Sequence, residues 1–347
     1  MNKGVVVATF FVVLVAVMVM IPALLTGFGD EELTPVAAVE SEKVVALPDE
    51  GPIIRVYRTK EKRTEEISLE AYVRGVVAAE MPADFHVEAL KAQALAARTY
   101  IIDRLRKDNF HDMESSFGEG AKGAHVSDTV RHQVYASDEM LRAKWGAEYI
   151  SYSNKVNQAV KETENKVLLY EKQPIYAAFF STSNGRTENS EDYFTAPYPY
   201  LRSVDSSWDQ ESPKFRDEVT LSLDEFSKKL LENTRKKVSP PNKWNSNWIK
   251  VKGWTEGERV DEVIIDGQLF SGREVREALN LSSSDFTWKY DQGKLTFRTE
   301  GYGHGVGMSQ WGANLMAEEG KGAQEIVKHY YSGIDIGQVN QVLASKK

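Results

Sequence analysis

LEAYVRGVVAAEMP, residues 69–82, is the stretch from which the organisation of this chain can be worked out. Its apolar side chains recur at spacings of three and four, which predicts the buried face of a helix. Pro82 disfavours helical backbone at Met81, so the helix is predicted to end at about Glu80. Glu80 continues the apolar face formed by Leu69, Tyr72, Val73, Val76 and Val77.

A carboxylate at this position has two open interpretations. Burial and the negative end of the helix dipole both disfavour the charged form, so both raise the pKa of Glu80. A carboxyl group that stays protonated near neutral pH can act as a general acid. Alternatively, Glu80 is a buried partner of a nearby Lys or Arg.

The N-terminal segment predicts a membrane anchor. Residues 4–28 contain no charged side chain and are long enough to span a bilayer as a helix. Lys3 precedes the segment and acidic residues follow it, which favours an extracytoplasmic location for the rest of the chain. A signal peptide is the competing interpretation, but it would have a shorter apolar core and a small-residue cleavage site.

The net charge and the cysteine content limit which partners and which stabilising bonds are expected. The net charge is −8, which argues against a nucleic-acid partner. The chain has no cysteine, so disulfides play no part in its stability.

The remaining sequence predicts an α+β fold. We expect a hairpin from Ile53–Thr59 and Thr64–Ile67, with Ser68 as the N-cap of the helix that leads to Glu80. Further expected helices are Val87–Leu105, Val134–Trp145 and Ser153–Glu164, and expected strands are Val167–Tyr170, Ile175–Phe180, Trp248–Val251, Glu262–Ile265 and Lys294–Arg298.

The predicted domains follow from changes in amino-acid composition along the chain. They are an anchor (1–28), a linker (29–51), a mixed catalytic domain with a helical pair and a sheet (52–204 and 301–347), and an inserted smaller α+β subdomain (205–300).

A glycine-rich segment, GYGHGVGMSQWG at residues 301–312, is the second informative feature. Glycine at every second position would leave one face of a strand bare, so the segment predicts a bent loop that a ligand can approach. It lacks the patterns of phosphate-binding loops. A sugar would suit its aromatic, amide and imidazole side chains, which belong to Tyr302, His304, Gln310 and Trp311. The alternative is that Trp311 is an ordinary core residue and His304 a turn residue.

Five segments in the same order resemble the stage II sporulation protein D family, which shares its domain with amidase-enhancer proteins. They are residues 80–82 (EMP), 88–100 (EALKAQALAARTY), 181–187 (STSNGRT), 267–276 (GQLFSGREVR) and 301–313. The resemblance implies a lytic transglycosylase that cleaves peptidoglycan glycan strands without stem peptides and leaves 1,6-anhydro ends. It also implies forespore engulfment, at the mother-cell membrane facing the septum, with stage II sporulation proteins P and M as partners. Protein P would supply the amidase step.

The resemblance assigns the catalytic acid to Glu80. One acid suffices for this reaction, because no water has to be activated: the residue protonates the leaving oxygen and then deprotonates the C6 hydroxyl. Lys91 and Arg98 lie seven residues apart on one helix face and would hold substrate oxygens or position Glu80. Their alternative role is an exposed charged stripe with Glu88. Weaker candidates for sugar contacts are Ser183 and Tyr193, for which an ordinary surface role is the alternative.

No cofactor or metal is expected. Some relatives bind zinc through a Cys-Asp-x-x-His-Cys-Gln-x-Tyr segment. Here Ser127 and His132 replace the cysteines and Arg131 replaces the histidine. His125 and His132 alone would make a poor zinc site.

Two rival functions stay open. One is a non-catalytic glycan-binding amidase enhancer, and the other is a muramidase that releases reducing ends. The products of cleavage distinguish them.

Overall fold

The computed structural model describes residues 43–49, 51–194 and 196–344. The predicted anchor (1–28) and most of the predicted linker (29–51) lie outside these residues. Within the described ranges, no helix has both the length and the apolar character needed to cross a bilayer. Val44–Lys347 forms one compact unit. Val44 and Leu47, which were predicted as linker, pack against its core.

The α+β prediction is confirmed. The first two strands of the described ranges, β1 (Ile53–Arg58) and β2 (Arg63–Ser68), form an antiparallel hairpin, and β3 (Val126–Ser127) pairs in parallel with β1. The helix after the hairpin, α2 (Leu69–Glu80), ends where Pro82 predicts. Ser68 occupies its N-cap position, but its side chain caps no backbone N–H.

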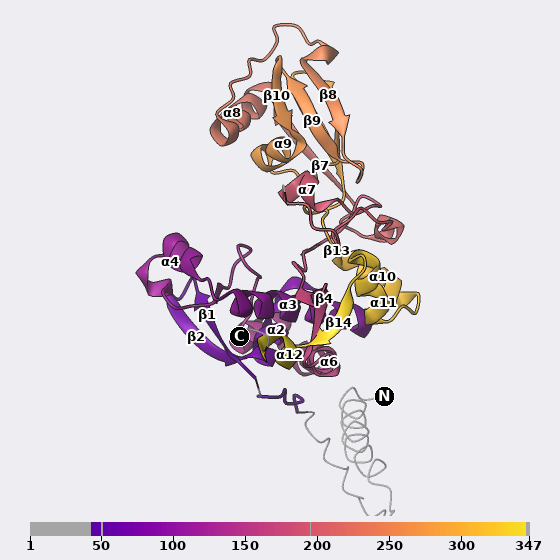
Figure 1. Ribbon diagram of the computed structural model, residues 1–347. Helices are drawn as coiled ribbons and strands as arrows, with labels where there is room; N and C mark the ends of the chain where they lie inside the picture. Colours follow the sequence, from indigo (N-terminus) through magenta and orange to yellow (C-terminus); the bar gives the residue numbers. More distant parts are fainter. Residues whose placement is uncertain (1–42, 50, 195, 345–347) are drawn as a thin grey trace, which may run out of the picture. The chain divides into compact units, whose positions relative to one another are not determined.

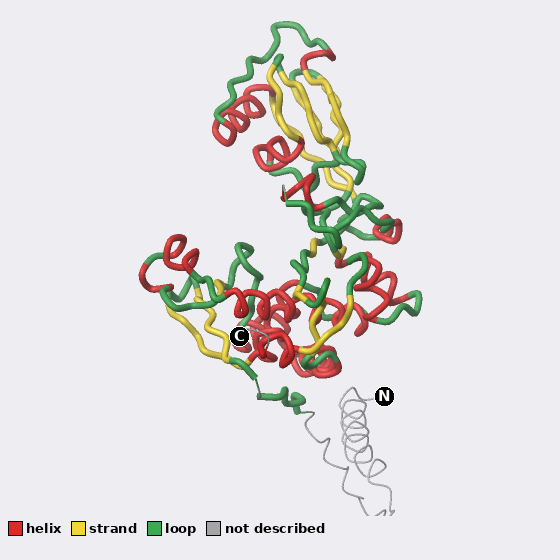
Figure 2. Tube along the Cα trace, in the orientation of Figure 1, coloured by secondary structure: helices red, strands yellow, loops and turns green. Residues whose placement is uncertain are grey.

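Of the helices in the described ranges, α3 (Val87–Lys107) is the longest, and it lies in the group of helices that surrounds the first of two large hydrophobic cores (Figure 2). Its alanines allow close approach, and α2, α6 and strand β4 pack against it. The helices that complete this core and its surroundings are α4 (His111–Phe117), α5 (Asp138–Trp145), α6 (Tyr149–Glu162), α7 (Ser190–Phe194), α10 (Gln310–Glu318), α11 (Ala323–Tyr330) and α12 (Val339–Ala344).

Two small sheets join the middle of the chain to its C-terminal part. In one, β4 (Lys166–Tyr170) pairs with β5 (Gln173–Pro174) and with β14 (Asp335–Gln338). In the other, β6 (Phe179–Phe180) pairs in parallel with β13 (Met308–Ser309). This second pairing places the 181–187 segment beside the glycine-rich loop.

A second hydrophobic core is formed by residues between Leu221 and Phe297. Helices α8 (Leu223–Thr234) and α9 (Gly272–Leu279) pack together on one side of the strands (Figure 1). The strands form two sheets, ordered β10-β9-β8 and β11-β12-β7. Their bounds are β7 (Arg216–Ser222), β8 (Ile249–Trp254), β9 (Val260–Ile265), β10 (Gln268–Ser271), β11 (Phe286–Asp291) and β12 (Lys294–Glu300). The proposed domain boundaries stay a prediction.

Two element predictions were wrong. In the Ile175–Phe180 run, only Phe179 and Phe180 form a strand, because Met308 and Ser309 offer only a two-residue partner. The predicted Val134–Trp145 helix begins at Asp138, where Ser137 accepts a hydrogen bond from the Met140 N–H. The residues before Ser137 instead run along α2.

Candidate active site

Glu80 is the last residue of α2, and Met81 after it has extended backbone (φ −112°, ψ 146°). Its side chain is half-buried, and Oε1 accepts a hydrogen bond of 2.9 Å from the Val134 N–H. No Lys, Arg or His in the described ranges pairs with it. Burial raises the pKa of Glu80, and the Val134 N–H opposes that shift. The buried-ion-pair interpretation therefore does not apply.

Gly75 explains how the 134–136 segment comes so close to α2. A Cβ at this position would lie 2.3 Å from the Tyr135 ring, so only glycine leaves room for the segment. The Ala136 N–H donates to the Gly75 carbonyl at 3.2 Å. The contact fixes the backbone that delivers the Val134 N–H to Glu80.

Glu80 lies in the wall of a cavity of about 400 Å³. The cavity is of the size that small-molecule and sugar sites usually have. Among the described residues, Glu80 is the single carboxylate in its lining. The other lining residues are Tyr100, Val130, Arg131, His132, Gln133, Tyr176, Ala177, Ala178, Phe179, Phe194 and His304.

His304 brings the glycine-rich loop into the same cavity. The loop has positive φ angles at each of its four alternate glycines, from +80° at Gly307 to +120° at Gly303, as expected for a bent segment. His304 Nδ1 accepts a hydrogen bond of 3.1 Å from the Val306 N–H. Burial, with the nearby Arg276 and Arg259, lowers the pKa of His304 to about 3, so the imidazole is neutral. Aromatic rings surround it, with centroid distances of 5.3–5.6 Å to Phe194, Tyr193 and Phe180.

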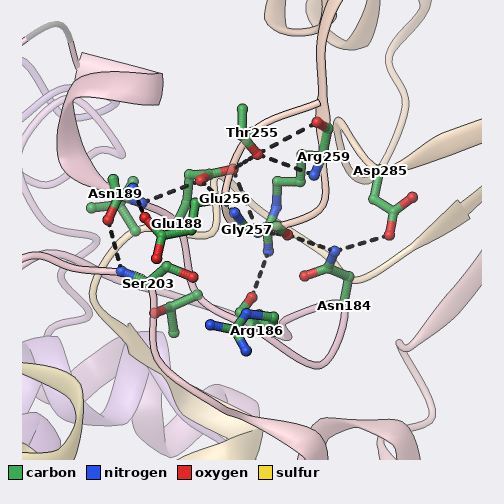
Figure 3. Close-up of polar contacts among 12 residues, drawn as sticks. Asn184, Arg186, Glu188, Asn189, Ser203, Thr255, Glu256, Gly257, Arg259 and Asp285 are labelled. Atoms are coloured by element: carbon green, nitrogen blue, oxygen red, sulfur yellow. Dashed lines mark hydrogen bonds and ion pairs between the residues drawn. The ribbon is translucent and has the colours of Figure 1, made fainter. Parts of the chain in front are cut away.

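The turn between β8 and β9 contacts this loop, and Figure 3 shows the polar contacts of Thr255, Gly257 and Arg259 from the turn. Arg259 from the turn is 3 % exposed, and a Cβ at Gly305 would lie 2.5 Å from its guanidinium carbon. Glu188 links the two segments, since its N–H donates to the Gly305 carbonyl at 2.8 Å and its carboxylate accepts from Thr255 Oγ1 at 2.6 Å. The Gly257 N–H donates to Glu188 as well, at 3.1 Å.

Asn184 provides a second link across the same junction (Figure 3). Its Nδ2 donates to the Gly257 carbonyl at 3.0 Å and to Asp285 Oδ2 at 2.9 Å. Residues 205–300 therefore support the backbone next to His304. No local sequence pattern around Arg259 indicates this role.

Arg98 does not reach the cavity. Its side chain is 0 % exposed and forms a bidentate ion pair with Glu70, with Nε–Oε1 and Nη2–Oε2 distances of 2.9 and 2.6 Å. A fully buried guanidinium cannot contact a glycan, so the expected substrate role is corrected to a structural one. Lys91 is also elsewhere: it pairs with Glu88 at 2.6 Å and with Glu162, in a separate cavity of about 350 Å³.

Ser183 is buried and cannot contact a sugar directly. Its hydroxyl donates to Asp209 Oδ2 at 2.8 Å, and Ser206 donates to the same carboxylate oxygen at 2.6 Å. Ser309, within the glycine-rich segment, donates to Asp209 Oδ1 at 2.7 Å. Asp209 thus connects the segments that contain Ser183, Ser206 and Ser309. Ser183 therefore has a structural role beside the site.

The remaining predicted residues have different surroundings. Tyr193 packs against His304, and the Arg273 guanidinium lies over its ring at 4.4 Å. Tyr302 is 48 % exposed, with Lys214 5.4 Å from its ring centroid. Gln310 is buried, and Trp311 packs edge-on against Phe85 at 4.8 Å. None of these four lines the cavity of Glu80.

The segment that corresponds to the zinc-binding segment of some relatives is held together here by hydrogen bonds. His132 Nδ1 lies 2.8 Å from Ser127 Oγ, and Nε2 lies 2.9 Å from Asp112 Oδ2. His125 Nδ1 accepts from the Arg55 N–H at 3.2 Å, and burial lowers its pKa to about 4. Within the described ranges, no group of three His, Asp or Glu is arranged to hold a metal ion. That zinc does not bind stays a prediction.

Several known proteins are similar to this chain over most of its length. A family model described as "Stage II sporulation protein" matches residues 57–170. Stage II sporulation protein D of Bacillus amyloliquefaciens is 47% identical over 296 residues, covering 85% of this chain and 82% of that protein.

Two proteins of Bacillus subtilis (strain 168) are also similar. Its amidase enhancer is 30% identical over 314 residues, covering 75% of this chain and 39% of that protein. Its stage II sporulation protein D is 44% identical over 345 residues, which cover 95% of both chains. Identity at this level over nearly the whole length of both proteins establishes that the chain belongs to the stage II sporulation protein D family.

Proposed function

We propose that this protein is a peptidoglycan lytic transglycosylase with Glu80 as its acid and base. The observation that carries the proposal is the state of Glu80: a half-buried carboxyl of raised pKa, open to a cavity of about 400 Å³. Family membership supports a role in sporulation.

The chemistry needs a single carboxyl group. Protonated Glu80 would give its proton to the glycosidic oxygen between N-acetylmuramic acid and N-acetylglucosamine. The 2-acetamido group of the substrate would stabilise the positive charge that develops at C1. The Glu80 carboxylate would then take the proton of the C6 hydroxyl as that oxygen attacks C1 and closes the 1,6-anhydro ring. Hydrolytic glycosidases ordinarily need two carboxylates, whereas the lining residues described for this cavity include one.

The Val134 N–H supports this double role. It donates a hydrogen bond to Oε1 of Glu80, and no described residue forms a hydrogen bond with Oε2. Oε2 is thus the oxygen that would carry the proton and face the substrate. The tight Gly75 contact fixes the donor in place, which keeps the carboxyl oriented between the two proton transfers.

The remaining parts of the proposal come from the family. The substrate would be glycan strands from which an amidase has removed the stem peptides. The protein would act in forespore engulfment with stage II sporulation proteins P and M, held in the mother-cell membrane by residues 1–28 with its C-terminal part outside. Tests of these points are co-purification with P and M from sporulating cells and protease accessibility of the C-terminal part.

Mass spectrometry of products from purified, peptide-free strands tests the activity. We expect 1,6-anhydromuramic ends from the wild-type chain and a ~10²–10⁴-fold loss for Glu80→Gln. Glu139→Gln, at an exposed glutamate of α5, is the matched control and should cut at the wild-type rate. Reducing ends instead of anhydro ends would indicate a muramidase.

A non-catalytic enhancer is the second candidate, because the amidase enhancer of Bacillus subtilis is 30% identical. In that case Glu80→Gln would leave sporulation intact, and no cleavage products would form. The enhancer would instead raise the rate of a separately purified amidase on intact peptidoglycan.

A further inference from the structure

The cavity beside Glu80 has one cationic side chain at neutral pH among its described lining residues. That side chain is Arg131. The two histidines in the lining, His132 and His304, both have pKa values lowered by burial and are neutral. Arg131 is exposed, and none of the described carboxylates forms an ion pair with it. Its charge is thus available to a ligand.

Arg131 belongs to a loop that is fixed on both sides. The His132 N–H donates to the Thr129 carbonyl at 3.0 Å, which closes a turn around Arg131. The His132 ring is held by Ser127 and Asp112, and Gln133 accepts a hydrogen bond of 3.1 Å from the Tyr72 hydroxyl.

The same loop also contacts Glu80. Three residues after Arg131, the Val134 N–H bonds to Glu80 Oε1. Three residues span at most about 11 Å, so the flexible Arg131 side chain can reach a sugar that is bound at Glu80.

Apolar surface lies beside this charge. Val130 is 88 % exposed and Tyr176 is 36 % exposed, and both line the same cavity. The Tyr176 ring is held by Tyr198 and Phe194, at centroid distances of 5.6 and 5.5 Å. A ligand that fits these walls has an apolar face and, next to it, an anionic group.

We propose that Arg131 binds the carboxylate of a sugar acid, namely the free lactyl carboxylate of N-acetylmuramic acid. The inference rests on the proposed function and assigns the recognition of its substrate. A lactyl group that still carries a stem peptide is an uncharged amide at this position. An arginine binds a carboxylate through two parallel N–H···O bonds, which an amide cannot accept in the same way. Arg131 therefore favours strands that have already lost their peptides.

The test compares two substrates with the full-length chain. One is peptide-free glycan with free lactyl carboxylates, and the other is the same glycan after conversion of those carboxylates to methylamides. The variants are Arg131→Gln, Arg131→Lys and the control Arg63→Gln, which changes an exposed arginine of β2 that is outside the cavity lining. Release of anhydro ends gives kcat and KM, and thermal unfolding checks that each variant is folded.

We expect Arg131→Gln to raise KM about three- to tenfold on the carboxylate strands and to leave kcat unchanged, as befits an exposed charge pair. Arg131→Lys should retain part of the effect, and added salt should reduce the difference. On methylamide strands the wild-type chain and Arg131→Gln should have the same KM. Equal KM values on the carboxylate strands, or an equal rise on both substrates, would overturn the assignment.

Binding measurements separate this inference from the proposed reaction. If no chain releases anhydro ends, the transglycosylase proposal fails. Fluorescence anisotropy with labelled strands and the Glu80→Gln chain then still decides the role of Arg131. Tighter binding of carboxylate strands that is lost in Arg131→Gln supports it, and equal binding of both strands refutes it.

Discussion

Replacing Arg98 by Met should destabilise the protein strongly, because it leaves the Glu70 carboxylate buried without its partner. Both side chains are almost fully buried, with exposed fractions of 0 % for Arg98 and 3 % for Glu70. Their two hydrogen bonds of 2.9 and 2.6 Å are of the charge-assisted, bidentate kind. Removing one partner of such a pair typically costs about 3–5 kcal/mol.

A loss of that size is a large share of the stability of an ordinary domain, which is about 5–15 kcal/mol. Urea unfolding, followed by circular dichroism, measures it as a lower midpoint. In a heating experiment the same loss should lower Tm on the order of 10 °C.

The double variant Arg98→Met with Glu70→Leu provides the control. It removes both charges together, so most of the lost stability should return. Cleavage of peptide-free strands below the unfolding temperature should be near the wild-type rate in the double variant. If Arg98→Met kept full stability but lost cleavage, or if the stable double variant stayed inactive, Arg98 would act on the substrate and the structural interpretation would be wrong.

Three further predictions concern Glu80, the glycine-rich loop and the region expected to lack zinc. The raised pKa of Glu80 means that the folded protein binds this proton more tightly than the unfolded chain does. The stability that the Glu80 proton contributes is therefore complete below the ordinary Glu pKa and is lost as pH rises through the raised pKa of Glu80. Glu80→Gln should be more stable than the wild type only at pH values above this raised pKa. The kcat of the wild type should fall across the same pH range as the acid form is lost, and a pH-independent stability difference would contradict this. Gly305→Ala should lower stability about 1–3 kcal/mol more than Gly267→Ala in urea titrations, since both have positive φ (+86° and +75°) but only at Gly305 would the new Cβ meet the Arg259 guanidinium. Prolonged treatment with a chelator should leave Tm unchanged, and metal analysis giving about one zinc per chain would refute the hydrogen-bonded account of the region around His132.

Local signals in the sequence determined the elements that carry the family motifs. The three- and four-residue spacing from Leu69 and the proline at 82 predicted a helix that ends at Glu80, and the structure has that helix. The alternation of glycines from 301 to 307 predicted a bent loop, and each of these glycines has a positive φ. Helices α4 and α7–α12 were not predicted, although two of them have clear start signals: Ser222 with Glu225 in α8, and Ser271 with Glu274 in α9, form capping boxes.

Only the tertiary structure decided which predicted residues share a cavity. Lys91 and Arg98 follow the same helical spacing, yet one is in a separate cavity and the other is fully buried against Glu70. The pattern of a helix indicates which side chains share a face, but the partner of that face comes from elsewhere in the chain.

Contacts between distant segments account for the rest. His304 reaches the cavity of Glu80 through the pairing of β6 with β13, and Arg259 supports it from the β8–β9 turn. Propensity, periodicity and turn chemistry act over a few residues, so they determined where the helices and the glycine-rich loop lie in the sequence. The meeting of residues 80, 131, 176 and 304 around one cavity depends on packing across more than two hundred residues of chain, and only the folded structure contains that information.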